Sequence, residues 1–291
     1  MELSWTMKLR IAAAAAVGVI LIGILAWPLA APSEMTGAIS PGGAVTVVLL
    51  ALLAGLIAYF VSWPHGREIG ILAVPFGLTV WAVRSGTMAA LVQLNPTDAE
   101  RQSLLESLRW QSLFWLVVVA AGFVGPMLCQ KVLSRKKNLA QEQKSKFKPV
   151  KHLSAIIAVA AAAFIAQFCI KIFAQDIRLS DDSFGSVVAQ PAIGQIGFAV
   201  LLSFGLAAFT VRKLLGVGYV WPIIATSIVT AYSVSVYANH AQYLAQQWPA
   251  VFFANAASAV SPVQMVAFGT LGSVAGYWMT ARYDFWRKYE M

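Results

Sequence analysis

The sequence predicts an all-α integral membrane protein with eight transmembrane helices, arranged as two tandem four-helix repeats. Of the 291 residues, 59% are hydrophobic and 11% are charged, whereas a soluble domain typically has about 25% charged residues. Charge is therefore too scarce to cover a surface that faces water, and we expect most of the surface to face lipid. The apolar runs of the chain and their recurrence in its second half support the same fold class.

Eight apolar runs are long enough to cross a bilayer, which takes about 20 mostly apolar residues. The expected spans are 9–31, 43–63, 69–93, 111–133, 152–175, 191–211, 217–239 and 262–282. The first run follows Lys8 and Arg10, as in a secretory signal peptide, but it exceeds the usual apolar core of about 7–15 residues. We therefore expect this run to remain as the first transmembrane helix.

Segments of the first half recur in the second half at an offset near 150 residues. The segment GLIAYFV at 55–61 corresponds to GLAAFTV at 205–211. Similar offsets relate Pro41 to Pro191, Gly125 to Gly276, Pro75 to Pro222, and Thr79 to Thr226. Such internal duplication is common in membrane transporters. The expected domains are a first repeat at 1–137, a basic cytoplasmic linker at 138–150 and a second repeat at 151–291.

The distribution of charge predicts the orientation of the helices. With the N-terminus inside, most of the 21 Lys and Arg residues fall in inner segments, and most of the 12 acids fall in outer segments. This pattern satisfies the positive-inside rule and places both termini in the cytoplasm. Each repeat then starts inside and has an even number of helices, so the two are related by a pseudo-twofold axis along the membrane normal. We expect a bacterial inner membrane.

The loops predict further surface features. The 131–151 loop has eight basic residues and one acid; it is either a topology determinant or a contact for an anionic lipid or a cytoplasmic protein. Leu104, Leu105 and Leu108 recur at helical spacing, which predicts a short amphipathic helix at the outer surface. The uncharged segment 242–262 is expected to be interfacial or re-entrant. Because topology accounts for the net charge of +9, no nucleic-acid partner is expected.

Small residues and prolines predict how the helices pack. Gly272 and Gly276 in the eighth span allow close backbone approach, either within the bundle or in a homodimer. Gly122 and Gly125 provide the corresponding small residues in the fourth span. Because proline removes one backbone hydrogen bond, Pro75 and Pro222 are expected to bend the third and seventh helices.

A polar stripe on the seventh span is the first candidate for a solute-binding surface. Its residues are spaced by 4, 3, 4 and 3, so they share one helix face: Thr226, Thr230, Ser233, Tyr237 and His240. Lipid disfavours such a face, so it is expected to point into the bundle. There it either forms interhelical hydrogen bonds or lines a polar path.

Arg84 is the second candidate, because it lies in the outer third of the third span. A charge at the bilayer centre costs about 2.5–3.5 kcal/mol on insertion scales. The residue at the corresponding position of the second repeat is Ala231, so the repeat itself does not require this charge. We expect Arg84 either to line the solute site together with the polar stripe or to pair with a carboxylate of an outer loop.

The sequence contains no HExxH, GxSxG or Walker A motif and no cysteine metal cluster. No span has Asp or Glu in its interior, which argues against a carrier coupled to protons or sodium. We therefore expect no enzymatic activity, no cofactor and no metal. The leading hypothesis is a permease-like subunit that binds or passes a small solute between its repeats, with other membrane subunits as partners. The alternative is a membrane scaffold or assembly subunit of a larger multiprotein complex.

Overall fold

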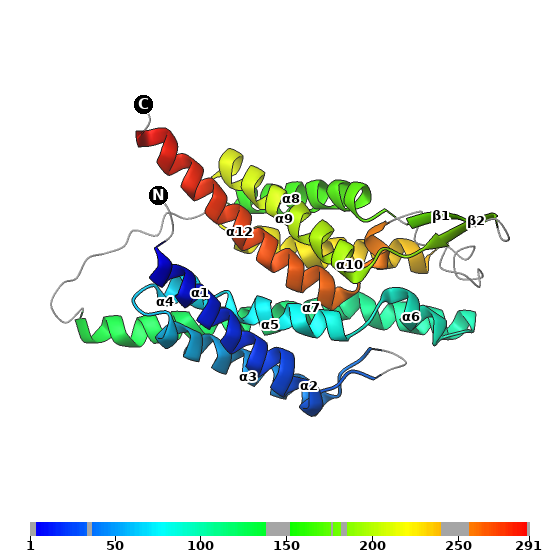
Figure 1. The fold of residues 1–291 in the computed structure, drawn as a ribbon, viewed down its shortest axis with the longest axis horizontal. Coiled ribbons are helices and arrows are strands. Elements are labelled where there is room, and N and C mark those ends of the chain that lie inside the picture. Colours follow the sequence, from blue (N-terminus) through cyan, green and yellow to red (C-terminus); the bar gives the residue numbers. More distant parts are fainter. Residues whose placement is uncertain are drawn as a thin grey trace. The chain divides into compact units, whose positions relative to one another are not determined.

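The structure is a computed structural model that describes residues 4–33, 37–137, 152–175, 177–181, 185–239 and 256–289. The described chain is helical, as predicted, apart from one short β-hairpin (Figure 1). It divides into two compact units. Unit 1 comprises Met1–Ala31, Ile39–Trp81 and Leu116–Lys151, and unit 2 comprises Pro32–Ala38, Ala82–Trp115 and His152–Met291.

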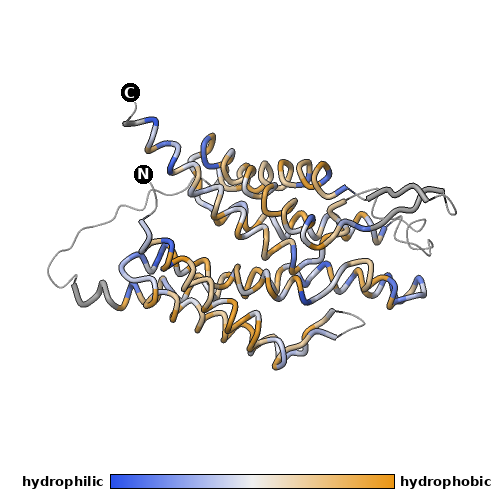
Figure 2. Tube along the Cα trace, in the orientation of Figure 1, coloured by the Kyte–Doolittle hydropathy of each residue, from blue (hydrophilic) through white to orange (hydrophobic). Residues whose placement is uncertain are grey.

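Seven helical segments of the described chain are long and apolar enough to cross a membrane. They are Trp5–Leu29, Pro41–Val61, Gly66–Arg84, Asp98–Val132, Leu153–Phe173, Ile193–Leu215 and Val220–Ala238. Hydrophobic residues dominate these segments in Figure 2. These seven helices are consistent with an integral membrane protein. By length and apolar composition, seven of the eight predicted spans are therefore found.

The eighth expected span is helix α12 (Pro262–Tyr289), which has sufficient length at 28 residues but is not among the seven apolar segments. Nearly all of its residues from 262 to 274 are buried. Several of them are polar, including Gln264, Thr270 and Ser273. A helix covered by its neighbours presents little surface to lipid, so it does not need the apolar composition of a lipid-facing helix.

Unit 1 contains two complete helical segments, most of a third and part of a fourth. These are α1 (Trp5–Gly18) with the π-helix Val19–Leu25 and α2 (Ala26–Leu29), then α3 (Pro41–Val61), then α4 (Gly66–Gly70) with α5 (Ala73–Arg84), and the C-terminal part of α7 (Asp98–Lys137). Helix α3 begins at a proline, and Ser40 caps it by accepting a hydrogen bond from the Gly43 amide at 3.2 Å.

The third predicted span is interrupted, whereas the sequence predicted one bent helix over 69–93. Pro75 has no amide hydrogen to donate to the carbonyl four residues earlier. The helix is accordingly interrupted between α4 and α5. Gly86, with φ of 78°, separates α5 from α6 (Met88–Gln93). The positive φ is accessible to glycine at little cost. The bend expected at Pro75 is therefore a break, and the span ends at Arg84.

The predicted amphipathic surface helix is the N-terminal part of α7, which is one helix of 40 residues. Thr97 and Glu100 form a capping box, in which the Thr97 hydroxyl accepts from the Glu100 amide at 3.3 Å and a Glu100 carboxylate oxygen accepts from the Thr97 amide at 3.1 Å. Leu104, Leu105 and Leu108 are buried. The expectation of a separate interfacial helix is wrong, because its apolar face packs against protein.

Unit 2 combines α6 and the N-terminal part of α7 with the remaining elements of the chain. These are α8 (His152–Phe173), β1 (Ile177–Asp181), β2 (Gly185–Ala189), α9 (Ile193–Leu215), α10 (Val220–Ala238), the 3-10 helix Ala256–Ala259 and α12. The strands pair antiparallel, with Ile177 opposite Ala189 and Asp181 opposite Gly185. The sequence analysis missed this hairpin. Residues 138–151 and 240–255, which include most of the basic loop and of the 242–262 segment, lie outside the described chain.

Glycine allows two helices to approach closely in each unit. In unit 1, a Cβ on Gly55 of α3 would overlap the carbonyl oxygen of Gly122 on α7. In unit 2, a Cβ on Gly276 of α12 would overlap the carbonyl oxygen of Gly205 on α9, and Gly272 lies at the same crossing. Gly55 and Gly205 are 150 residues apart, as are Gly122 and Gly272. The same crossing therefore occurs at corresponding residues.

A proline and a threonine also take the same local arrangement in both units. Pro75 is the third residue of α5, and Pro222 is the third residue of α10. Thr79 and Thr226 lie one turn later, and each hydroxyl donates to the carbonyl of the residue after the proline, at 2.7 and 2.6 Å. Because Pro222 lies in the first turn of its helix, it does not bend α10.

We predict that Gly276→Ala and Gly55→Ala lower the free energy of unfolding by about 1–3 kcal/mol each, since an added methyl group meets backbone that has little room to move. Gly194→Ala and Gly42→Ala are matched controls, because each is the second residue of its helix and has open space around it. Unfolding of the purified protein in detergent, followed by tryptophan fluorescence, measures the difference. Equal stability of Gly276→Ala and Gly194→Ala would contradict the assigned helix crossing.

Candidate functional site

The polar stripe of α10 lies inside unit 2. Thr226, Thr230 and Ser233 are buried. The hydroxyls of Thr226 and Thr230 donate to carbonyl groups one turn earlier on their own helix, at 2.6 and 2.9 Å. The Ser233 hydroxyl has no hydrogen-bond partner in the described chain. The stripe thus points into the helical packing, and the two threonines are satisfied by backbone groups.

The other sequence-predicted site residues are Arg84, Tyr237 and His240. Arg84 is the last residue of α5, and its side chain is exposed. His240 lies outside the described residues. Tyr237 is buried near the end of α10 and lines a pocket. Tyr237 is thus the predicted residue from which the candidate site is built.

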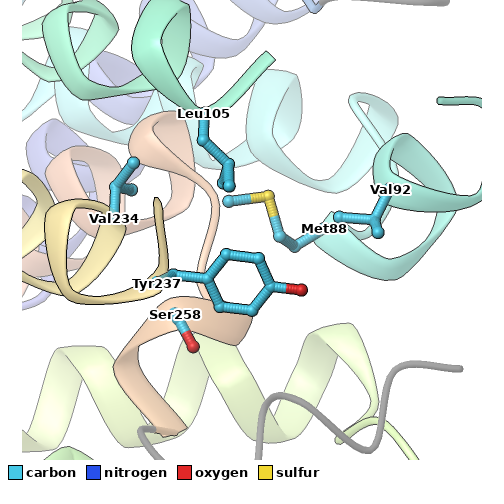
Figure 3. A pocket seen from close by; sticks show the side chains of 6 residues that line it. All are labelled: Met88, Val92, Leu105, Val234, Tyr237 and Ser258. Carbon is cyan, nitrogen blue, oxygen red and sulfur yellow. The ribbon is translucent and has the colours of Figure 1, made fainter. Parts of the chain in front are cut away.

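Four elements of unit 2 converge on this pocket (Figure 3). Helix α6 contributes Met88 and Val92, α7 contributes Leu105, α10 contributes Val234 and Tyr237, and the 3-10 helix contributes Ser258. The empty volume is about 200 Å³, including the open mouth. In Figure 3 the Met88 side chain extends between Leu105 and the ring of Tyr237. The pocket is therefore small and mostly apolar, with two hydroxyl-bearing side chains.

Arg101 brings a positive charge to this region. It is buried, with 7% of its surface exposed, and its Nε donates to the carbonyl of Asn95 at 2.9 Å. Its guanidinium also interacts electrostatically with Tyr237. A buried arginine is uncommon unless its donors are engaged, so Arg101 links the α6–α7 turn to the end of α10.

The sequence analysis did not single out Arg101 and missed its burial. The signal was present in the helical spacing. Arg101 precedes Leu104, Leu105 and Leu108 by 3, 4 and 7 residues, which places it on their face of the helix. Because Leu104, Leu105 and Leu108 are buried, an arginine on the same helix face also lies in the protein interior.

Two glutamine side chains fix the elements around the pocket. Gln190 accepts from the Ala89 amide at 2.9 Å and donates to the Ala259 carbonyl at 3.2 Å. Gln264 forms a capping box with Ser261 at the start of α12. The side-chain amide nitrogen of Gln264 also donates to the carbonyl of Gly86 at 3.1 Å. These bonds join α6, the 3-10 helix and α12, and so hold the pocket walls in place.

The described residues contain no group of three or more His, Cys, Asp or Glu side chains arranged to hold a metal ion. Comparisons with protein-family models, with curated proteins and with solved structures each find no match. Function is therefore argued from the site itself.

We predict that Arg101→Met destabilises the protein by about 1.5–3 kcal/mol, because hydrogen bonds to a charged group are lost and the Asn95 carbonyl loses this donor. Arg109→Met is the matched control: it lies two turns later on α7 with an exposed side chain, and should change stability by less than about 0.5 kcal/mol. Thermal unfolding of both variants in the same detergent measures the effect. Similar unfolding temperatures for the two would show that Arg101 does not tie these elements together.

Proposed function

We propose that this protein is a non-enzymatic, permease-like membrane subunit that binds a small solute in a pocket of unit 2 lined by residues of both predicted repeats. The proposed architecture has eight spans in two tandem repeats, with both termini in the cytoplasm of a bacterial cell. Within the site expected between the repeats, we propose that the solute binds in the pocket around Tyr237. Other membrane subunits remain the proposed partners.

The proposal of eight spans is supported by features that recur in the two units. The glycine crossing at Gly55 in unit 1 corresponds to that at Gly205 in unit 2. The threonine hydroxyls of Thr79 and Thr226 make the same backbone hydrogen bond. In this architecture α12 is the fourth helix of the second repeat, and it tolerates polar residues because its neighbours shield it from lipid.

The observation that carries the proposed binding function is that Tyr237 and Ser258 line an otherwise apolar pocket, while the buried charge of Arg101 acts on Tyr237. A few polar groups on apolar walls are typical of ligand sites. The space of about 200 Å³ includes the open mouth, and it encloses no room for a water molecule, so a small solute binds here only if the lining side chains move apart. Met88 is unbranched and flexible, so it can move aside for a solute. A small carboxylate suits the positive charge of Arg101.

The scaffold alternative is favoured by a different observation. Thr226 and Thr230 are buried and already hydrogen-bonded to their own helix, so the stripe does not require a water-filled path. A solid bundle whose partners bind its outer surface would have the same interior. In that case the function of the protein is assembly with other subunits rather than solute binding.

We predict that Tyr237→Phe weakens binding of small carboxylates about three- to tenfold, since one net hydrogen bond contributes about 0.5–1.5 kcal/mol. Tyr232→Phe is the matched control, because Tyr232 lies on the same helix with an exposed side chain. Ligand-induced thermal shifts of the protein in nanodiscs, recorded for small carboxylates and for neutral amides of equal size, measure the effect. No stabilisation of the unmodified protein by any carboxylate would count against the proposed function.

The same pair of variants distinguishes a permease-like subunit from a scaffold. A solute-binding subunit should keep its co-purifying membrane partners in Tyr237→Phe while solute binding falls. Mass spectrometry of gently solubilised native complexes reports the partners. If Tyr237→Phe releases the partners while Tyr232→Phe retains them, the region around the pocket serves assembly, and the scaffold hypothesis replaces the proposal.

A further inference from the structure

Cations and aromatic rings lie together where the C-terminal parts of α9 and α12 meet in unit 2. Arg212 and Lys213 belong to the last turn of α9. The Cζ of Arg212 lies 3.8 Å from the centre of the Tyr277 ring, and the Nζ of Lys213 lies 3.9 Å from the centre of the Tyr283 ring. Cation–π contacts at these distances favour one position for each charge.

The rings that hold these cations are themselves fixed. Tyr277 packs edge-on against Tyr219 with centroids 5.2 Å apart, and Tyr283 packs against Phe209 at 6.4 Å. The hydroxyl of Thr280 on α12 donates to the Gly276 carbonyl at 2.9 Å. The two charges are therefore positioned in advance by packed neighbours, which distinguishes them from lysines on a mobile loop.

The positive charge of this cluster is not balanced by acids of the described chain. No described carboxylate pairs with Arg212, Lys213 or Arg282, and Asp284 is the one acidic residue of α12. The Nε of Arg212 is buried and has no hydrogen-bond partner in the part of the chain that the structure describes. Because this nitrogen is enclosed by protein, an anion at the cluster would contact the terminal nitrogens of the Arg212 guanidinium instead.

The cluster lies where a span ends. The apolar segment Ile193–Leu215 ends two residues after Lys213, and Figure 2 shows hydrophilic residues at the C-terminal end of α12. Tyr283 and Trp286 are partly exposed there, as is common for aromatic residues at the headgroup level. Leu214 and Met279 are strongly exposed, so an apolar surface lies beside the charges.

We propose that Arg212 and Lys213 bind the phosphate of an anionic phospholipid headgroup. A guanidinium matches the geometry of a phosphate with paired N–H donors, and the lysine adds a second fixed charge. The adjacent Leu214 and Met279 would contact the acyl chains, which favours a lipid over a free phosphate. This site is separate from the pocket around Tyr237, and it does not depend on the proposed solute.

The test uses the full chain, purified and delipidated in a neutral detergent, with native mass spectrometry to count bound lipids. Phosphatidylglycerol and phosphatidylcholine with the same acyl chains are the probes, and inorganic phosphate is added as a competitor. We expect phosphatidylglycerol to bind about tenfold tighter than phosphatidylcholine. Arg212→Gln combined with Lys213→Gln should remove about tenfold of that affinity. Inorganic phosphate should not displace the lipid.

The charge-matched control is Lys8→Gln combined with Arg10→Gln, which removes two positive charges from the start of α1 and should leave lipid affinity unchanged. Lys213→Gln alone, at an exposed side chain, should lower the affinity about fivefold and remains informative if the double variant does not fold. Equal binding of the two lipids, an undiminished affinity of the cluster variants, or displacement by inorganic phosphate would each overturn the proposal.

Discussion

The close approach of helix backbones is the constraint on which the rest of this structure depends. In lipid there is no hydrophobic drive to bring helices together, so packing relies on van der Waals contact between small residues. Gly55 and Gly122 meet this need in unit 1, and Gly205 with Gly276 meets it in unit 2. A side chain at any of these crossings would separate helices whose contact area holds the unit together.

The same close packing determines where polar groups are tolerated. In α12, Ser273 and Thr280 are buried and donate to the carbonyls of Gly269 and Gly276 one turn earlier, at 2.7 and 2.9 Å. A buried hydroxyl that bonds to its own backbone avoids the cost of an unmade hydrogen bond. At the start of the helix, the side-chain amide of Gln264 likewise donates to a backbone carbonyl, that of Gly86. The polar groups around the pocket are thus tied into the backbone of neighbouring elements.

Much of the fold was predictable because long apolar runs and helical spacing are local signals. The sequence located seven segments that the structure shows as helices long and apolar enough to span a membrane, and the spacing of Leu104, Leu105 and Leu108 located the amphipathic part of α7. Tertiary packing was not predictable from local pattern. The break before Pro75 and the burial of the N-terminal part of α7 depend on neighbouring elements. The hairpin of Ile177–Asp181 and Gly185–Ala189 was missed although the sequence between its strands is rich in the turn residues Asp, Ser and Gly.

The candidate site was predictable in part for the same reason. The stripe pattern correctly marked Thr226 and Tyr237 as facing away from lipid, because a polar face on a spanning helix needs cover. Arg84 was predicted as a site residue because its charge lies within a span, but its side chain is exposed. The buried arginine is Arg101, and its burial was indicated in the sequence by its spacing from the leucines of α7. The residues that close the pocket, Met88 and Ser258, come from short elements whose positions depend on the glutamine hydrogen bonds described above.

The account depends most directly on α12 crossing the membrane as the fourth helix of a second repeat. The test is accessibility of single cysteines at Ser4 and Asp284, both exposed, after Cys129 and Cys169 have been replaced by alanine. With a membrane-impermeant maleimide, the account predicts that neither position reacts in intact cells and that both react after permeabilisation. Reaction of one position but not the other in intact cells would place the termini on opposite sides, and would contradict an even number of spans.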